Sequence, residues 1–138
     1  EGYRYSSSIN PISHDHYGMP DAPRFTYWPA GEDGVVEFPM TTLHLFGRNL
    51  PCSGGGYFRL MPYALFQTAI RRFNRVDAHP AIFYFHPWEI DPGQPRLGGL
   101  SAKARFRHYL NLDRMERRLR RALADFRWGR MDHVFGIG

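Results

Sequence analysis

The spacing of apolar residues predicts two amphipathic helices in the second half of the chain. Over residues 62–76, apolar side chains recur every three to four positions with arginines between them, as in a helix with one buried face. A last helix is predicted over residues 113–128, with Asp113 and Glu116 as its capping box. We expect its buried stripe to be Met115, Leu119, Leu123 and Phe126, and its exposed face to include Arg117, Arg120 and Arg121.

Short runs of β-branched and aromatic residues predict the strands. Such runs occur at residues 2–7, 35–38 and 42–46, each bounded by turn residues. Residues 81–86 read AIFYFH, and this continuous apolar run predicts a buried strand covered on both faces, as in a parallel sheet or barrel. Residues 131–135 are expected to form a final short strand or a turn. Helix, short turn and buried strand make half of a βαβ unit, so the pattern predicts the α/β class.

Three irregular regions separate these elements, and one of them is residues 92–104. A long, turn-rich loop follows the first strand, and loops of this length within compact domains are commonly functional. Residues 49–56 are predicted to be a glycine loop, because three consecutive glycines let the backbone approach a neighbour or ligand closely.

The composition is that of a globular protein with many aromatic rings. The 138 residues fit one domain; 43% are hydrophobic, 22% are charged and 16% are aromatic. So many rings suit an aromatic core or a surface that stacks on sugars or bases. No run of eighteen apolar residues occurs, so we predict no membrane span. Because the first residue is Glu1 rather than Met, we also expect the chain to be part of a longer protein.

Charge and cysteine content exclude little by themselves. The net charge of +5 permits contact with phosphates or acidic polysaccharides. The arginines of the last helix share its surface with Asp113, Glu116 and Asp125, which indicates a solvated face, and we predict no nucleic-acid binding. Cys52 has no partner for an internal disulfide and cannot build a thiolate metal site alone, so we interpret it as a buried filler.

The strongest candidate chemistry lies in residues 83–91, FYFHPWEID. An apolar run ends at His86, and in α/β folds ligands bind at the carboxyl ends of strands. A histidine there is suited to be a general acid, a general base or a metal ligand. The alternative interpretation is a strand-end histidine that hydrogen-bonds a neighbouring loop. A second cluster, His14-Asp15-His16, has zinc-ligand chemistry, but a lone loop of this kind is more typical of exposed or substrate-facing residues, so we predict no metal site in this chain.

Four stretches of the chain together resemble the C-terminal region of NodB-homology polysaccharide deacetylases, in the subfamily associated with exosortase (PEP-CTERM) loci. They are GYRYSSSINPISHDHYGMPDAPR, EFPMTTLHLFGRNLPCSGGGYFRLMPYAL, FYFHPWEIDPGQPR and FRHYLNLDRMERRLRRALADF. The resemblance implies the C-terminal part of a distorted (β/α) barrel with a loop-rich insertion. The whole chain, residues 1–138, would belong to the deacetylase domain, with the insertion at about 10–60 and the closing strand and helices at about 61–138.

The resemblance also implies roles for individual residues. His86 matches the general acid that protonates the leaving amine, and Trp88, Tyr17 and His14 are expected to contact the substrate. The parent enzyme would hold a divalent metal, zinc being expected, through motifs that precede Glu1, so this chain alone would bind no metal and be inactive. Relatives read YDSS where this chain has Ser6 in place of the aspartate thought to orient the histidine. Either that pairing is weaker here or another acid substitutes.

The function implied is part of a metal-dependent carbohydrate N-deacetylase acting on an exopolysaccharide or its precursor. The alternative is a non-catalytic carbohydrate-binding or structural module. The expected partners are the polysaccharide substrate and the missing N-terminal part of the same barrel. We also expect either a homodimer or insertion loops that cover the gap, since a cut sheet exposes unpaired edges. The compartment would be the bacterial cytoplasm or the cell envelope.

Overall fold

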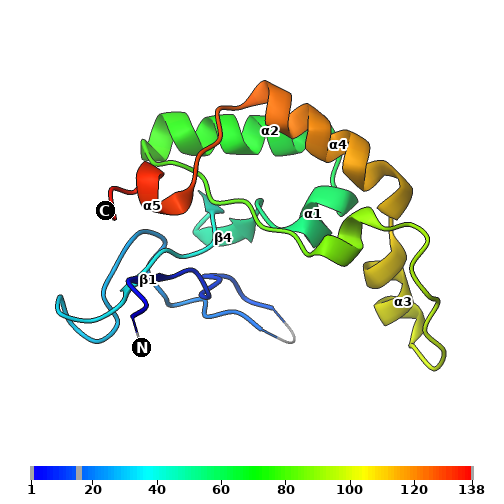
Figure 1. The fold of residues 1–138 in the computed structure, drawn as a ribbon, viewed down its shortest axis with the longest axis horizontal. Helices are drawn as coiled ribbons and strands as arrows, with labels where there is room; N and C mark the ends of the chain where they lie inside the picture. Colours follow the sequence, from blue (N-terminus) through cyan, green and yellow to red (C-terminus); the bar gives the residue numbers. More distant parts are fainter. Residues whose placement is uncertain (1, 15–16, 138) are drawn as a thin grey trace.

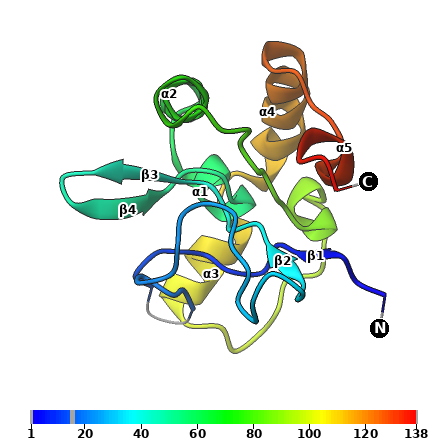
Figure 2. The ribbon, with the colours of Figure 1, turned by 90° about the vertical axis from the view of Figure 1, so that its left-hand side faces the viewer.

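The computed structural model describes residues 2–14 and 17–137. Helices and short strands are mixed along it, which confirms the α/β class. The two longest helices, α2 and α4, lie on the same side of the molecule in both views (Figures 1 and 2). The elements are β1 (Tyr5–Ser6), β2 (Val36–Glu37), β3 (Thr42–Leu45), β4 (Arg48–Pro51), α1 (Gly55–Leu60), α2 (Tyr63–Arg72), the π-helix η1 (Phe73–Asp77), the 3-10 helix η2 (Pro87–Ile90), α3 (Ala102–Tyr109), α4 (Leu112–Asp125) and α5 (Met131–Val134).

The strands form two small pairs rather than one large sheet. Strand β1 pairs with β2 in parallel, and β3 pairs with β4 as an antiparallel hairpin that projects from the body (Figure 2). The three predicted strands in residues 2–46 are therefore confirmed, in shorter form. The prediction of a loop over residues 49–56 is wrong, because β4 and the start of α1 occupy it. The tight turn that returns the chain is built by Phe46 and Gly47, both at positive φ.

Helices α2 and α4 enclose the hydrophobic core. The predicted helix over residues 62–76 is confirmed as α2 and its continuation η1. Met115 is buried, and Leu119 and Phe126 pack partly buried against the core, but Leu123 is 55% exposed, so its predicted burial is wrong. Ala122 takes the core position instead. The exposure of the three predicted arginines is confirmed. The core residues are Leu43, Cys52, Phe58, Tyr63, Phe66, Ala69, Ile70, Phe73, Met115 and Ala122.

The run at residues 81–86 does not form the buried strand that was predicted. Its one bridge is parallel and joins Tyr84 to Gly54, and residues 81–85 are only half-buried. Phe83 and Phe85 pack against the helical core on one side, which accounts for their apolar character without a second covering layer. The prediction that residues 131–135 are a strand or turn is also wrong, because Met131–Val134 form the helix α5. Closure into a barrel with an earlier part of a longer protein stays a prediction.

The glycine run lets two chain segments approach closely, as the sequence indicated. The amide of Gly55 donates to the carbonyl of Tyr84 at 2.9 Å. A Cβ atom on Gly54 would lie 2.9 Å from the Tyr84 hydroxyl oxygen. One on Gly55 would overlap both carboxylate oxygens of Glu89. Residues 54 and 55 therefore need to be glycine for the segment that carries His86 to lie against α1.

Tyr63 provides a test of the core in alkaline solution. Burial, together with the hydrogen bond to Asp125, raises the pKa of the Tyr63 phenol from 10.0 to about 12. The folded state keeps this proton to higher pH than the unfolded chain, so the stability it contributes is complete below pH 10 and is lost towards pH 12. We expect the free energy of unfolding in urea to fall less steeply over this window in Tyr63→Phe. Tyr3→Phe, at a side chain that is 79% exposed, should keep the wild-type slope. An unchanged slope in Tyr63→Phe would contradict the assignment.

Candidate functional site

His86 caps the short helix η2 and presents half of its ring to solvent. Its side chain is 58% exposed. Pro87 starts the helix, and a 3-10 turn places residues three apart on the same side, so Glu89 comes back beside His86. The Oε1 atom of Glu89 accepts a hydrogen bond from the His86 backbone amide at 3.0 Å and lies 3.1 Å from the Nδ1 atom of the ring. The imidazole is thus held through one nitrogen, and within the described residues Nε2 has no hydrogen-bond partner.

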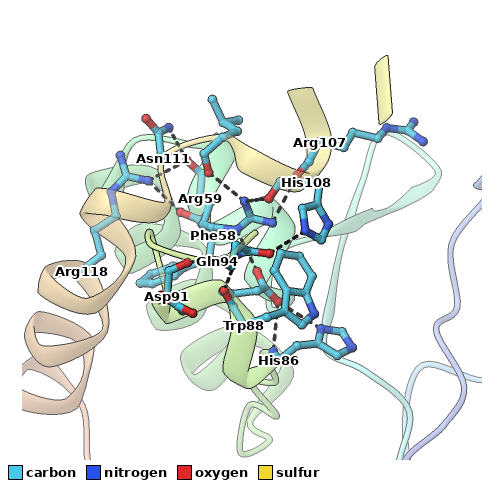
Figure 3. A network of polar contacts seen from close by, with 12 residues as sticks. Phe58, Arg59, His86, Trp88, Asp91, Gln94, Arg107, His108, Asn111 and Arg118 are labelled. Carbon is cyan, nitrogen blue, oxygen red and sulfur yellow. Dashed lines mark hydrogen bonds and ion pairs between the residues drawn. The ribbon is translucent and has the colours of Figure 1, made fainter. Parts of the chain in front are cut away.

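The carboxylate of Glu89 is buried and paired with a buried arginine. Both side chains are 2% exposed, and Arg59 Nε donates to Glu89 Oε2 at 2.8 Å. Figure 3 shows Arg59 reaching from α1 into the centre of this network. The guanidinium also donates to backbone carbonyls at the end of α3 and just after it, those of Arg107, His108 and Leu110. Arg59 therefore compensates the charge of Glu89 and joins α1, η2 and α3.

Trp88 lies between two histidines in this network. Its ring stacks on His108 at a centroid distance of 4.3 Å and on His86 at 5.7 Å (Figure 3). His108 is held by Gln94, whose side-chain amide also donates to the Trp88 carbonyl. The Arg59 guanidinium lies 5.2 Å from the Trp88 ring centroid. Trp88 thus packs and orients His86, and the prediction that it contacts substrate stays a prediction.

A pocket of about 350 Å³ lies next to this network. His14 and Tyr17, both predicted to contact substrate, stack within it at a centroid distance of 3.9 Å. Tyr84 joins the pocket to the histidine network, because it lines the pocket and its ring centroid lies 6.1 Å from that of His86. His86 itself is not part of the lining. The lining residues are His14, Tyr17, Gly56, Tyr57, Leu60, Tyr84, Phe106, Arg107 and Leu110.

Two phenols of this pocket, those of Tyr57 and Tyr84, have a raised pKa. Burial, with the charge and hydrogen bond of Tyr17, raises the pKa of Tyr57 to about 12. Burial also raises the pKa of Tyr84, with smaller contributions from Tyr17 and Glu89. Aromatic faces beside hydroxyl groups match a sugar, which presents both C–H surfaces and hydroxyls. The pocket is therefore chemically suited to a carbohydrate ring.

Ser6, where the resemblance implies an aspartate, makes no contact with the His86 ring among the described residues. Its hydroxyl lies 3.0 Å from that of Ser8. The amides of Ser8 and Ile9 both donate to the buried carboxylate of Glu37, which anchors this segment at β2. Within the described residues, the carboxylate that contacts the His86 ring is Glu89, and whether it substitutes for the aspartate stays a prediction.

The other chemical candidates have structural explanations or stay untested. Cys52 is 2% exposed, and burial raises the pKa of its thiol to about 12, which fits a buried filler. Arg118 of α4 donates to three carbonyls at the end of α1, so it braces that helix. The described residues contain no group of three or more potential metal ligands. The prediction for the cluster at 14–16 falls on Asp15 and His16, which lie outside the described residues. No helix in the described part is long and apolar enough to cross a membrane.

Arg59, Glu89, Tyr57 and Tyr84 belong to the site but were not singled out from the sequence. For Glu89 a signal existed, since it follows His86 by three residues in a segment opened by proline. For Arg59 none did, because its partner lies 30 residues away along the chain.

Comparison with known proteins places this arrangement in a family. The model of the family described as a domain of unknown function, DUF3473, matches residues 7–136, so the chain belongs to that family. Neither the curated proteins nor the solved structures give a significant match.

Proposed function

We propose that this chain is the part of a metal-dependent carbohydrate N-deacetylase that supplies the general acid and part of the sugar-binding surface. The observation that carries the proposal is the pairing of His86 Nδ1 with buried Glu89, which leaves Nε2 exposed near a pocket rich in tyrosine. The association of DUF3473 with polysaccharide deacetylases supports the same class. The subfamily, and its exopolysaccharide substrate, rest on the resemblance of the sequence.

In this proposal His86 delivers the proton that releases the amine. The C–N bond breaks, its electron pair goes to nitrogen, and the proton moves from Nε2 to that nitrogen. The imidazole is left neutral with its remaining proton on Nδ1, facing Glu89. The described residues contain no group of three or more potential metal ligands. The metal that the class requires would be held outside them, and the chain's own contribution is proton delivery and substrate contact.

The proposal is tested by acetate release from an N-acetylated glucosamine oligomer. We expect the intact protein with its divalent metal to release acetate, and chelation to abolish the release. Residues 1–138 alone are expected to release none and to hold no metal at sub-micromolar affinity. The proposal fails if the metal-loaded intact protein leaves N-acetylated glycans, including its own polymer, unchanged. If residues 1–138 alone bind stoichiometric metal and release acetate, the proposal that the metal is held elsewhere is wrong.

A non-catalytic carbohydrate-binding module is the second candidate. The observation that favours it is that the aromatic pocket is lined without His86. This candidate predicts glycan binding that is lost in a variant of Tyr57, is unchanged in His86→Ala, and persists after chelation. Acetate release by the intact protein would decide against it.

A further inference from the structure

We propose that Glu89 is the positioning residue of His86: its buried carboxylate fixes the proton of the neutral ring on Nδ1, so that Nε2 is the nitrogen that exchanges protons. The inference deepens the proposed function, because it says how the general acid is oriented. Glu89 would act through His86 and would not touch substrate.

The direction of the hydrogen bond follows from the chemistry of the two groups. An ionised carboxylate only accepts, so the nitrogen 3.1 Å from Glu89 Oε1 must carry a proton. The same oxygen accepts the backbone amide of His86 at 3.0 Å, which prevents the carboxylate from rotating away from the ring. A histidine without such a partner favours the other tautomer, with its proton on Nε2. Glu89 therefore selects the tautomer that leaves Nε2 free after proton transfer.

Glu89 is itself held from two further sides. Arg59 occupies Oε2, and its positive charge offsets the cost of burying the carboxylate. Gly55 lies against the carboxylate, where any Cβ atom would overlap both oxygens. The ring of His86 is flanked by Trp88 and Tyr84, so its plane is fixed as well. Gly55, Arg59 and Glu89 together fix the position of the His86 imidazole.

The structure shows no contact from Ser6 to the His86 ring among the described residues. Ser6 stands where the resemblance places an orienting aspartate, and it bonds Ser8 instead. Within the described residues, Glu89 is the carboxylate that contacts the His86 ring. A carboxylate in this position also stabilises the imidazolium form that donates the proton, as the aspartate does in a serine-protease triad.

The test is ¹⁵N NMR of the imidazole nitrogens in protein labelled at histidine, at a pH where the ring is neutral. In the wild type we expect His86 to show a protonated Nδ1 and an unprotonated Nε2. In Glu89→Gln the amide oxygen is needed by the charged Arg59, so the NH₂ group turns towards His86, and the backbone amide of His86 loses its acceptor. Nδ1 then becomes the acceptor, and the Nε2-protonated form is expected to become the main one.

Two further variants separate positioning from folding. Glu37→Gln alters another carboxylate that is 3% exposed and lies far along the chain, so it should keep the wild-type tautomer even where it lowers stability. Gly55→Ala pushes the Glu89 carboxylate aside without changing its charge, and we expect it to release the tautomer preference too. Gly55→Ala also tests the inference if Glu89→Gln does not fold. A wild-type ring protonated on Nε2, or a folded Glu89→Gln with the wild-type tautomer, would overturn the inference.

In the intact protein, Glu89→Gln should lower kcat and leave KM nearly unchanged, while Glu89→Asp recovers part of the loss. This outcome is separable from the proposed function. If the tautomer changes as expected but the intact protein is no deacetylase, positioning stands and the function falls. If acetate is released and kcat is insensitive to Glu89, the function stands and the positioning role falls.

Discussion

Replacement of Arg59 by methionine is expected to lower the free energy of unfolding by about 3–5 kcal/mol, the usual effect of removing one partner of a buried ion pair. Both Arg59 and Glu89 are 2% exposed, so the carboxylate left behind would be buried without its counter-charge. The variant also removes the donors to three carbonyls at the end of α3. Urea unfolding of the wild type and Arg59→Met, followed by circular dichroism, measures the difference.

The matched control is Arg120→Met on α4. Arg120 pairs with Glu116 at 2.7 Å, but both side chains are mostly exposed, and such i,i+4 pairs contribute only about 0.3–0.5 kcal/mol. The double variant Arg59→Met with Glu89→Leu should regain part of the loss, because no unpaired charge remains. The carbonyls of α3 would still lack their donors, so recovery should be incomplete. If Arg59→Met and Arg120→Met lower the free energy of unfolding by similarly small amounts, the ion pair of Arg59 and Glu89 does not contribute to stability as proposed.

The sequence predicted the two longest helices, α2 and α4, because helical periodicity is a local property. It did not predict the shorter helices α1, α3 and α5, and α3 begins within the stretch at 92–104 that was expected to be irregular. The error at Leu123 has a geometric cause. Steps of four residues each turn about 40° beyond one full helical turn, so two in succession move a stripe onto the neighbouring face. Ala122, seven residues after Met115, stays on the core face, but its small side chain gives a weak hydrophobic signal. The predicted capping box at Asp113 is wrong. Helix α4 starts at Leu112, so Asp113 lies inside it, and the residue that precedes the helix is Asn111 at positive φ.

Tertiary packing decided the elements that the sequence missed. Continuous apolar character in residues 81–85 was interpreted as two-sided cover in a sheet, whereas aromatic rings there pack edge to face with Phe58 and Phe66. Periodicity cannot distinguish these two environments. The hairpin over β3 and β4 depends on a turn built by Phe46 at positive φ, a conformation that phenylalanine rarely adopts.

The candidate site was predicted in part. The sequence singled out His86 because it directly follows an apolar run, and the structure places His14 and Tyr17 in one pocket, while their roles stay predictions. Of the residues that support His86, Arg59 was missed because it comes from a different part of the chain. Arg59 looks like any surface arginine in the sequence, and only the fold buries it next to Glu89. The glycine run was noted for close approach, but the group that approaches, the Glu89 carboxylate, is visible only in the structure.

In the intact protein, His86→Ala is expected to reduce turnover about 10²–10⁴-fold, the usual contribution of general acid catalysis. The side chain is 58% exposed and its loss uncovers no large core surface, so folding should be preserved. Substrate binding through the neighbouring pocket should change little, which places the loss in kcat rather than in KM. Added imidazole is expected to restore part of the rate, because the vacated position is open to solvent. His44→Ala, at an exposed histidine on the β3 hairpin, should retain wild-type turnover. Wild-type turnover in His86→Ala would remove this residue from the mechanism, whatever the tautomer of its ring.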